Sequence, residues 1–322
     1  MYVVIIIGAG PIGLSAAIAA SRRNLKVLVV EKGILVNSIY HFPLNMTFFS
    51  DTSELEIGDV PLTTSSFKPT RFEVLNYYRR VVDHYRLDIR FHTRVDDLKK
   101  EKSTWIVHTE NGEELVTKNV VMATGYFDNP NELNVPGEEL PKVSHYYSDS
   151  HYFYKKKVVV IGGRNSAIEA ALEIYRAGGE VTMVHRGEWF DDMVKYWILP
   201  DIENRIGFGE IEAYFSSKVA AIDEKTVTIS VKAEREIKIP NDHVLALVGY
   251  HPDVSLMRGA GVSVDEESLV PEHDKKTFET NVEGLYIAGS LTVGKNANQI
   301  FIFNGRAHGD VIMSAIEAKS SS

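Results

Sequence analysis

The chain has 322 residues, which at about 150 residues per domain predicts two domains, each large enough to bury a core. Its 44% apolar and 25% charged residues are typical of a globular protein and exclude a disordered, collagen-like or disulfide-scaffold chain. Lys and Arg number 35 against 44 Asp and Glu, and the net charge of −9 argues against non-specific binding of nucleic acid. The chain has no cysteine, which excludes disulfides, thiolate metal sites, iron–sulfur clusters and catalytic thiols supplied by the protein.

The first predicted elements lie in residues 3–33, VVIIIGAGPIGLSAAIAASRRNLKVLVVEKG. An uninterrupted β-branched run predicts a strand buried on both faces, and a glycine turn, a helix with small residues and a second apolar run complete a βαβ unit. Residues 3–20 have the length of a signal peptide, but they lack a basic leader and glycines interrupt them. We therefore expect this stretch to belong to the fold and, since no other segment approaches a membrane span, we expect a cytoplasmic protein without membrane contact.

The glycine turn in this unit carries a dinucleotide fingerprint. Gly8, Gly10 and Gly13 have the spacing of G-x-G-x-x-G, Pro11 opens the helix, and Glu31 ends the second strand 23 positions after the first glycine. A pyrophosphate suits the amides of the helix N-terminus, and a carboxylate at this strand end suits the hydroxyls of an adenosine ribose. The sequence therefore predicts dinucleotide binding here.

The next segment departs from the βαβ pattern. Residues 38–61 are rich in aromatic and turn residues and predict loops and short strands over a ligand, and residues 73–85 have the periodicity of a packing helix. Asn111 and Gly112 form a predicted hairpin turn. Short strands are predicted at residues 88–93, 104–109, 114–116 and 120–125, and a linker at residues 129–137.

Residues 157–187, KVVVIGGRNSAIEAALEIYRAGGEVTMVHRG, repeat residues 3–33 without a gap, at a constant offset of 154. The copies differ at the positions that determine which dinucleotide binds, because Glu31 in the first copy corresponds to His185 in the second, and Lys32 corresponds to Arg186. A ribose 2′-phosphate is repelled by the carboxylate and attracted by the His-Arg pair. The first copy is therefore predicted to bind FAD and the second NADPH.

The second fingerprint is unusual because Arg164 replaces the glycine that normally lets the backbone approach the pyrophosphate. Two interpretations are open: the side chain swings aside and grips a phosphate, or this copy has degenerated and binds no dinucleotide. The presence of Arg186 favours the first. The predicted coenzyme contacts are Gly162, Arg164, Asn165, Ser166, Ala167, His185 and Arg186.

The remaining elements return the chain to its first domain. Strands are predicted at residues 226–231, 243–249 and 281–289, and a final helix at residues 298–317. The predicted fold is α/β with two Rossmann-like dinucleotide-binding domains. The NADPH domain, residues 123–251, is inserted into a discontinuous FAD domain, residues 1–122 and 252–322.

Motifs along nearly the whole chain are shared with one group of flavoproteins. Besides the two fingerprints they are ATG at residues 123–125, VGYHP at residues 248–252 and the segment from Gly284 to Gly289. With these motifs the chain resembles the low-molecular-weight thioredoxin reductase type. The blocks GRNSAIEAALE, VKYWILPD and NANQIFIFNG are similar to its bacillithiol-disulfide-reductase-like branch. The resemblance implies FAD, NADPH and a homo-oligomer.

The resemblance also implies which residues contact FAD. The start of the final helix, at Gln299 and Ile300, is expected to present amides and a positive dipole end to the flavin N1 region. Phe48 is either a flavin contact or plain core. His41 is the one candidate proton donor, although a structural role is the more usual one for such a histidine. The implied FAD contacts are Gly8, Gly10, Pro11, Gly13, Glu31, Lys32, Tyr40, His41, Phe42, Thr47, Phe48, Thr124, Gly125, Gly289, Ser290, Gln299 and Ile300.

Three departures from the group's pattern bear on mechanism. No Cys-x-x-Cys is present, and Ile12 occupies the place where some members of the branch carry a cysteine. Gly289-Ser290 stands where Gly-Asp is usual in this group, so we expect a flavin hydrogen bond to be weaker or to come from Asn296 or Asn298. The first two departures leave the flavin site intact but remove any thiol relay.

The sequence predicts an FAD-containing, NADPH-dependent oxidoreductase that reduces a low-molecular-weight disulfide such as bacillithiol disulfide directly at the flavin. Two alternatives stay open: a reductase of a small electron carrier such as ferredoxin or a quinone, and a non-catalytic NADPH redox sensor. Lys195, Tyr196 and Trp197 are candidates for lining a groove for a small acidic disulfide or a partner. No motif for a metal site is present.

Overall fold

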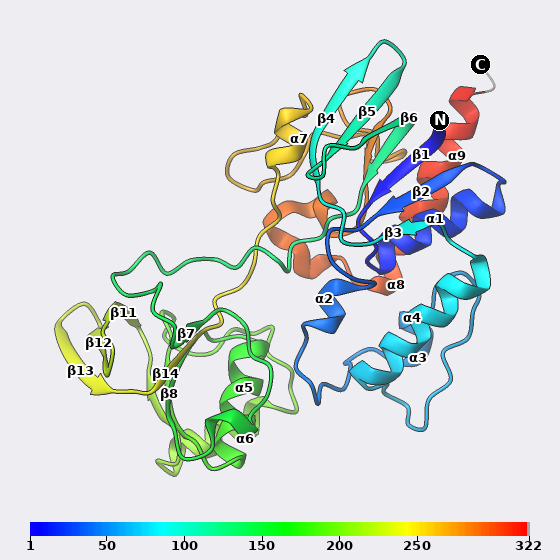
Figure 1. Ribbon diagram of the computed structural model, residues 1–322. Helices are drawn as coiled ribbons and strands as arrows, with labels where there is room; N and C mark the ends of the chain where they lie inside the picture. The colour runs from blue at the N-terminus through cyan, green and yellow to red at the C-terminus, as the bar shows by residue number, and fades with distance from the viewer. Residues whose placement is uncertain (321–322) are drawn as a thin grey trace. The chain divides into compact units, whose positions relative to one another are not determined.

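The computed structural model describes residues 1–320 and divides into two compact units (Figure 1). Unit 1 comprises Met1–Asn129 and Tyr250–Ser322, and unit 2 comprises Pro130–Gly249. The chain thus leaves the first unit and returns to it, as an inserted domain requires. The first part of unit 1 ends seven residues after the predicted boundary at 122, and unit 2 ends two residues before the predicted boundary at 251.

Unit 1 is built on a mixed sheet of seven strands. Its parallel part has the order β3-β2-β1-β6-β15, and an antiparallel part adds β5 and β4 beside β6. The bounds are β1 Tyr2–Ile7, β2 Val27–Val30, β3 Ile89–Arg90, β4 Val95–Glu101, β5 Thr104–Thr109, β6 Glu114–Met122 and β15 Leu285–Ile287.

Strand β6 joins the two parts of this sheet. The sequence predicts two strands, at residues 114–116 and 120–125, but the structure has one. Its first half pairs antiparallel with β5 from Glu114 to Thr117, and its second half pairs in parallel with β1 and with β15. A single strand therefore connects the hairpin to the parallel sheet.

Helices cover the sheet of unit 1, and the C-terminal helix α9 lies beside α1 near the N-terminus (Figure 1). Alanines of α1 are buried, and a Cβ on Gly309 would lie 2.7 Å from the Cα of Ala16, so the two helices pack closely. The bounds are α1 Pro11–Arg22, α2 Asn37–Tyr40, α3 Thr52–Leu55, α4 Arg71–Tyr85, α7 Ser255–Gly259, η2 Gly289–Gln299, α8 Ile302–Gly305 and α9 His308–Ser320.

Unit 2 contains a five-stranded parallel sheet of order β10-β9-β8-β14-β7 and a three-stranded antiparallel sheet of order β11-β12-β13. The strands are β7 Val143–Ser144, β8 Lys157–Ile161, β9 Glu180–Val184, β10 Glu212–Tyr214, β11 Ser217–Ile222, β12 Thr226–Val231, β13 Arg235–Pro240 and β14 His243–Ala246. The helices are η1 His151–Phe153, α5 Asn165–Arg176 and α6 Leu199–Gly207.

Two predicted segments differ from the structure. Residues 38–61 form the short helices α2 and α3 rather than short strands, with a single bridge between Thr47 and Thr70. The final helix predicted at residues 298–317 is broken into the end of η2, the four-residue α8 and α9.

No helix within residues 1–320 is long and apolar enough to cross a membrane.

Candidate functional site

The residues predicted to contact FAD in unit 1 gather at one edge of its sheet. Gly8 follows β1, Glu31 follows β2, Thr124 comes after β6 and Gly289 comes after β15. These four strands are parallel neighbours, so their carboxyl ends lie together. This is the edge at which open α/β sheets bind their ligands.

Two glycines of the first fingerprint are required by close backbone contacts. Gly8 has a φ of +110°, and a Cβ there would lie 2.4 Å from the carbonyl oxygen of Ala123. A Cβ on Gly13 would lie 2.0 Å from the carbonyl oxygen of Gly8, because α1 starts directly against the turn. A Cβ on Gly10 would meet no atom within 4 Å. The open space at Gly10 leaves the backbone accessible, as the fingerprint requires for a pyrophosphate.

The first turn of α1 is suited to an anion. Its N-cap, Gly10, provides no side-chain hydrogen bond, and Pro11 occupies the start of the helix. The amides of Ile12 and Gly13 at this end are among those that a helix leaves without an intrahelical partner, and the helix dipole adds positive charge there. These groups fit the pyrophosphate of FAD.

Glu31 is a buried carboxylate at the end of β2, with 6% of the residue exposed. Its Oε2 accepts the amide of Ala9 at 2.7 Å, and its Oε1 accepts the amide of Gly33 at 2.8 Å. A carboxylate has about four acceptor positions, so Glu31 can also accept two ribose hydroxyls. Lys32, the predicted neighbouring contact, has its Nζ 2.8 Å from the carboxylate of Asp128, where the chain leaves unit 1.

The segment from Tyr40 to Phe48 mixes exposed and buried side chains. Tyr40, His41 and Thr47 are exposed, whereas Phe48 is 7% exposed and belongs to the core of unit 1. His41 Nδ1 lies 2.8 Å from the carbonyl oxygen of Asn37, which is a local structural contact. Phe42 is half-buried and packs edge-to-face on Phe127 with a centroid distance of 5.2 Å.

The expected helix start at Gln299 and Ile300 is wrong. Gln299 ends the stretch η2, and Ile300 has an extended backbone with φ of −109° and ψ of 113°. The helix that follows, α8, has four residues, and α9 begins only at His308. A dipole of that length is small, because the dipole sums over aligned peptides. Asn296 and Asn298 are exposed.

Ile12 and Gly289 bring the two ends of the chain together at the site. A Cβ on Gly289, whose φ is +69°, would lie 3.3 Å from the Ile12 side chain. On its other side, Ile12 lies 2.9 Å from the position of a Cβ on Gly305. The place where a cysteine occurs in some relatives is therefore filled by an aliphatic side chain that packs against both glycines.

His308 is part of this neighbourhood, and the sequence analysis missed it. The amide of Gly289 donates to His308 Nδ1 at 3.2 Å in the interior. The two residues are 19 positions apart, and no motif marks His308 in the sequence. Its proximity to the glycine turn follows only from the docking of α9.

Unit 2 repeats the glycine turn at the carboxyl edge of its own sheet. Gly162 has a φ of +144°, and a Cβ there would lie 2.5 Å from the carbonyl oxygen of Leu247 and 2.8 Å from the Cβ of Ala167. Asn165 and the exposed Ser166 form the first turn of α5, whose N-cap Arg164 provides no side-chain cap. The amides of this turn fit a second pyrophosphate.

Arg164 contacts a segment that follows the second fingerprint. Its Nε lies 2.8 Å from Oδ2 of Asp191, and its side chain is 67% exposed. The amide of Met193 and, to a smaller extent, Arg164 lower the pKa of Asp191. Asn165 bonds the same segment, because its Oδ1 accepts the amide of Lys195 at 2.9 Å. The guanidinium keeps its Nη donors for an anion in this pose.

The second fingerprint ends at His185 and Arg186, directly after β9. A Cβ on Gly163 would lie 2.3 Å from the His185 ring, so the ring fits because that residue is glycine. Burial, followed by the charge of Arg186, lowers the pKa of His185, so the ring is neutral at pH 7. Arg186 is exposed and carries the positive charge of this strand end.

The residues predicted to line a groove follow this strand, and Lys195 contacts both Glu169 and Trp197. Lys195 forms an ion pair with Glu169, and its Nζ lies 5.9 Å from the centre of the Trp197 ring. Tyr196 is 82% exposed and Trp197 is 41% exposed.

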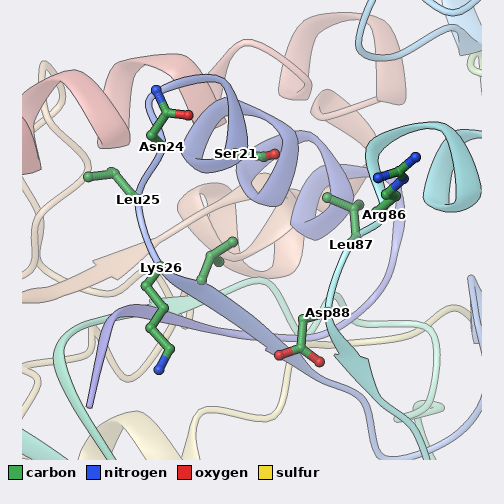
Figure 2. Close-up of a pocket in the computed structure, with 8 residues that line it drawn as sticks. Ser21, Asn24, Leu25, Lys26, Arg86, Leu87 and Asp88 are labelled. Atoms are coloured by element: carbon green, nitrogen blue, oxygen red, sulfur yellow. The ribbon is translucent and has the colours of Figure 1, made fainter.

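A surface depression elsewhere in unit 1 contains none of the predicted site residues. Figure 2 shows it at the C-terminal end of α1, lined by Ser21, Asn24, Leu25, Lys26, Arg86, Leu87 and Asp88. It lies at the amino edge of the parallel sheet, away from the glycine turn.

Within residues 1–320 no group of three or more His, Asp or Glu side chains is arranged to hold a metal ion.

Two glycine turns, each between a parallel strand and an uncapped helix, together with a carboxylate in one unit and arginines in the other, are typical of proteins that bind two dinucleotides. The chain belongs to the pyridine nucleotide-disulphide oxidoreductase family, whose sequence pattern matches residues 5–289. This confirms the predicted enzyme class, with FAD and NADPH as its cofactors.

Several full-length relatives refine this placement. Bacilliredoxin reductase Bdr of Bacillus subtilis (strain 168) is 43% identical over 98% of each chain. The structure of bacillithiol disulfide reductase Bdr (YpdA) from Bacillus cereus superimposes with a TM-score of 0.95 and 44% identity over 99% of each chain. The structure of bacillithiol disulfide reductase Bdr (YpdA) from Staphylococcus aureus has a TM-score of 0.95 and 41% identity, and the match covers 99% of this chain and 98% of the other. The resemblance and fold predicted from the sequence are confirmed.

Proposed function

We propose that this enzyme uses NADPH to reduce a low-molecular-weight disulfide of the bacillithiol disulfide type. The observation that carries the proposal is the full-length similarity to proteins titled bacillithiol disulfide reductase, at 44% and 41% identity. The balanced reaction is NADPH + H⁺ + RSSR → NADP⁺ + 2 RSH. We further propose that the enzyme is a cytoplasmic homo-oligomer.

Unit 1, Met1–Asn129 and Tyr250–Ser322, is the proposed FAD-binding domain, which the sequence places at residues 1–122 and 252–322. The amides of Ile12 and Gly13 bind the pyrophosphate beside the open backbone at Gly10, and Glu31 binds the adenosine ribose. Gly289 and Ser290 contribute from the strand that enters beside β6. When bound, FAD accepts two electrons from the nicotinamide and supplies them to the disulfide.

Unit 2 is the proposed NADPH-binding domain, within residues 123–251. Arg186 binds the ribose 2′-phosphate, and the neutral His185 packs beside it over Gly163. Arg164 uses the Nη donors that its contact with Asp191 leaves available. This supports the interpretation in which Arg164 swings aside to grip a phosphate.

The protein itself supplies no sulfur to the reaction. The chain has no cysteine, so it cannot form a mixed disulfide with the substrate. The aliphatic Ile12 packs against Gly289 and Gly305 and offers no reactive group at this turn. Both substrate sulfurs therefore leave as free thiols after direct reduction at the cofactor.

Anaerobic steady-state NADPH oxidation with bacillithiol disulfide tests the proposal. We expect turnover that is saturable in the disulfide and releases two thiols per NADPH. A matched variant, Glu31→Gln, keeps the shape of the side chain but removes the charge, and it should lose FAD affinity. Normal FAD content and normal reduction of the flavin by NADPH, without any thiol release from the disulfide, would refute the disulfide reductase function.

Reduction of an electron carrier is the second candidate. A ferredoxin–NADP reductase of Ignicoccus hospitalis is 26% identical over 89% of each chain, and the absence of cysteine here suits an acceptor that needs no thiol exchange. Brisk turnover with ferredoxin or a quinone, and none with the disulfide, would favour this candidate. A non-catalytic sensor would be reduced by NADPH once and would not turn over with any acceptor.

A further inference from the structure

His308 is a buried imidazole at the start of α9 that the site described above does not use chemically. The residue is 7% exposed, and its ring stacks on Phe278 with a centroid distance of 4.1 Å and an interplanar angle of 19°. The next residue, Gly309, packs directly against the backbone of Ala16 in α1. The ring is therefore held both by stacking and by the docking of its helix.

This imidazole binds the backbone of the turn that follows β15. Its Nδ1 lies 3.2 Å from the amide nitrogen of Gly289, in the protein interior. An imidazole nitrogen accepts a hydrogen bond only when it carries no proton, so the ring is neutral with its proton on Nε2. The contact thus depends on the protonation state of His308.

The hydrogen bond to His308 helps to set the geometry of the turn. Gly289 has a φ of +69°, a conformation that L side chains rarely adopt. Its carbonyl oxygen accepts the Thr292 hydroxyl at 2.8 Å. With the amide bound to His308 and the carbonyl bound to Thr292, the peptide groups on both sides of Gly289 are oriented. The direction in which Ser290 leaves β15 is set with them.

We propose that His308 is a positioning residue for the FAD site: its neutral imidazole holds the Gly289 amide and thereby sets the turn that carries Ser290. This inference rests on the proposed function, because it takes FAD to bind at the carboxyl edge of unit 1. Removal of the acceptor leaves a buried amide without its partner or lets the turn rotate away. Either change weakens FAD binding.

The surroundings of His308 keep the acceptor available at neutral pH. Burial is the main cause that lowers the pKa of His308 to about 4, and the charge of His273 lowers it further. His273 stacks on Phe278, the same ring that stacks on His308, at a centroid distance of 6.2 Å. Nearby, Glu279 from the same segment pairs with Lys319 of α9, with 2.7 Å between Oε2 and Nζ. Below about pH 4 the ring becomes a cation that cannot accept the Gly289 amide.

The dissociation constant of FAD, measured by flavin fluorescence on the full chain at pH 7, tests this role. His308→Phe keeps an aromatic ring for stacking but has no acceptor, and we expect FAD binding to weaken at least tenfold. His308→Asn places Oδ1 on the same atom that carries Nδ1 in histidine, and we expect binding within threefold of the wild type. His84→Phe, at an exposed site near the end of α4, is the matched control and should bind FAD as the wild type does.

A second measurement covers the case in which His308→Phe fails to fold. As the pH falls from 6 to 4, the wild type should release FAD at a higher pH than His308→Asn, which has no imidazole to protonate at this place. Identical release curves for these two proteins, or wild-type affinity in a folded His308→Phe variant, would overturn the inference and leave the proposed function intact. Failure of the wild type to bind FAD at pH 7 would overturn both.

Discussion

At the scale of single residues, charge at the ends of two equivalent strands distinguishes the two proposed dinucleotide sites. Glu31 after β2 is buried and accepts two backbone amides, so its carboxylate excludes a phosphate there. His185 and Arg186 occupy the equivalent strand end of unit 2. Burial lowers the pKa of His185, so the positive charge at this strand end at pH 7 comes from Arg186.

Replacement of Arg186 by alanine should therefore lower kcat/KM for NADPH by about 10- to 150-fold, or roughly 1.5–3 kcal/mol, the usual range for a charge-assisted contact. NADH has no 2′-phosphate, so its kcat/KM should change little. Steady-state kinetics with both coenzymes make the measurement, and Arg235→Ala, an exposed arginine of β13, is the control. Equal losses for both coenzymes would contradict the assignment.

Arg164→Ala examines the unusual second fingerprint. If the guanidinium grips a phosphate, the KM for NADPH should rise about 5- to 20-fold while kcat stays constant, because one ground-state contact is removed. Asp191→Asn, which keeps a hydrogen-bond acceptor for Arg164, should have a smaller effect. NADPH kinetics of Arg164→Ala that match the wild type would show that this residue does not contact the coenzyme.

The stability of the apo-protein should depend on His308 below pH 6.5. The pKa of this group is about 4 in the folded chain and about 6.5 when unfolded, so the unfolded state binds more protons as the pH falls. The contribution of the neutral ring is fully present above pH 6.5, and at pH 4.5 about 2–3 kcal/mol of it is lost. In thermal melts, the melting temperature of His308→Asn should fall less between pH 7 and pH 4.5 than that of the wild type. If the melting temperatures of the variant and the wild type fall equally, His308 does not titrate in this range.

At the scale of secondary structure elements, the contact of α1 with α9 brings the C-terminal segment to the proposed FAD site. Gly309 permits this contact, because a Cβ there would lie 2.7 Å from backbone atoms of Ala16. The gain in helix propensity from alanine is about 1 kcal/mol, which is smaller than the usual cost of a backbone clash in a packed interface.

Gly309→Ala should consequently destabilise the protein by about 1–3 kcal/mol and lower its melting temperature. Gly259→Ala is the matched control, since a Cβ at this helical glycine of α7 would meet no atom within 4 Å. The control should be neutral or slightly stabilising. Circular dichroism melts compare the two variants, and equal melting temperatures would show that α9 moves aside without cost.

The broken C-terminal helix shows the limit of apolar periodicity as a predictor. Residues 298–317 are apolar enough for one helix, but the side chain of Asn304 bonds the backbone at two places. Its Oδ1 accepts the amide of Phe301 at 2.7 Å, and its Nδ2 donates to the carbonyl oxygen of Gln299 at 2.9 Å. These bonds compete with the helical pattern, as asparagine commonly does.

At the scale of the whole molecule, the absence of cysteine limits the redox capacity of the protein to its cofactor. Anaerobic titration with NADPH should end at two electrons per FAD, and thiol alkylation of the enzyme should leave turnover unchanged, because no other redox group exists in the chain. Absorbance of the flavin during the titration gives the end point. Uptake of four electrons per FAD would contradict this stoichiometry.

The sequence alone determined the two βαβ units, their order, the charges at positions 31, 185 and 186, and the lack of a thiol. These features are local: strand, turn and helix lie within about 30 residues, and spacing together with residue chemistry is sufficient to identify them. The tertiary structure alone decided that His308 meets Gly289, that Arg164 meets Asp191, and that β6 serves two parts of one sheet. Those contacts join residues 19, 27 and more positions apart, and they form only because helices and strands dock around a shared core, which no local period encodes.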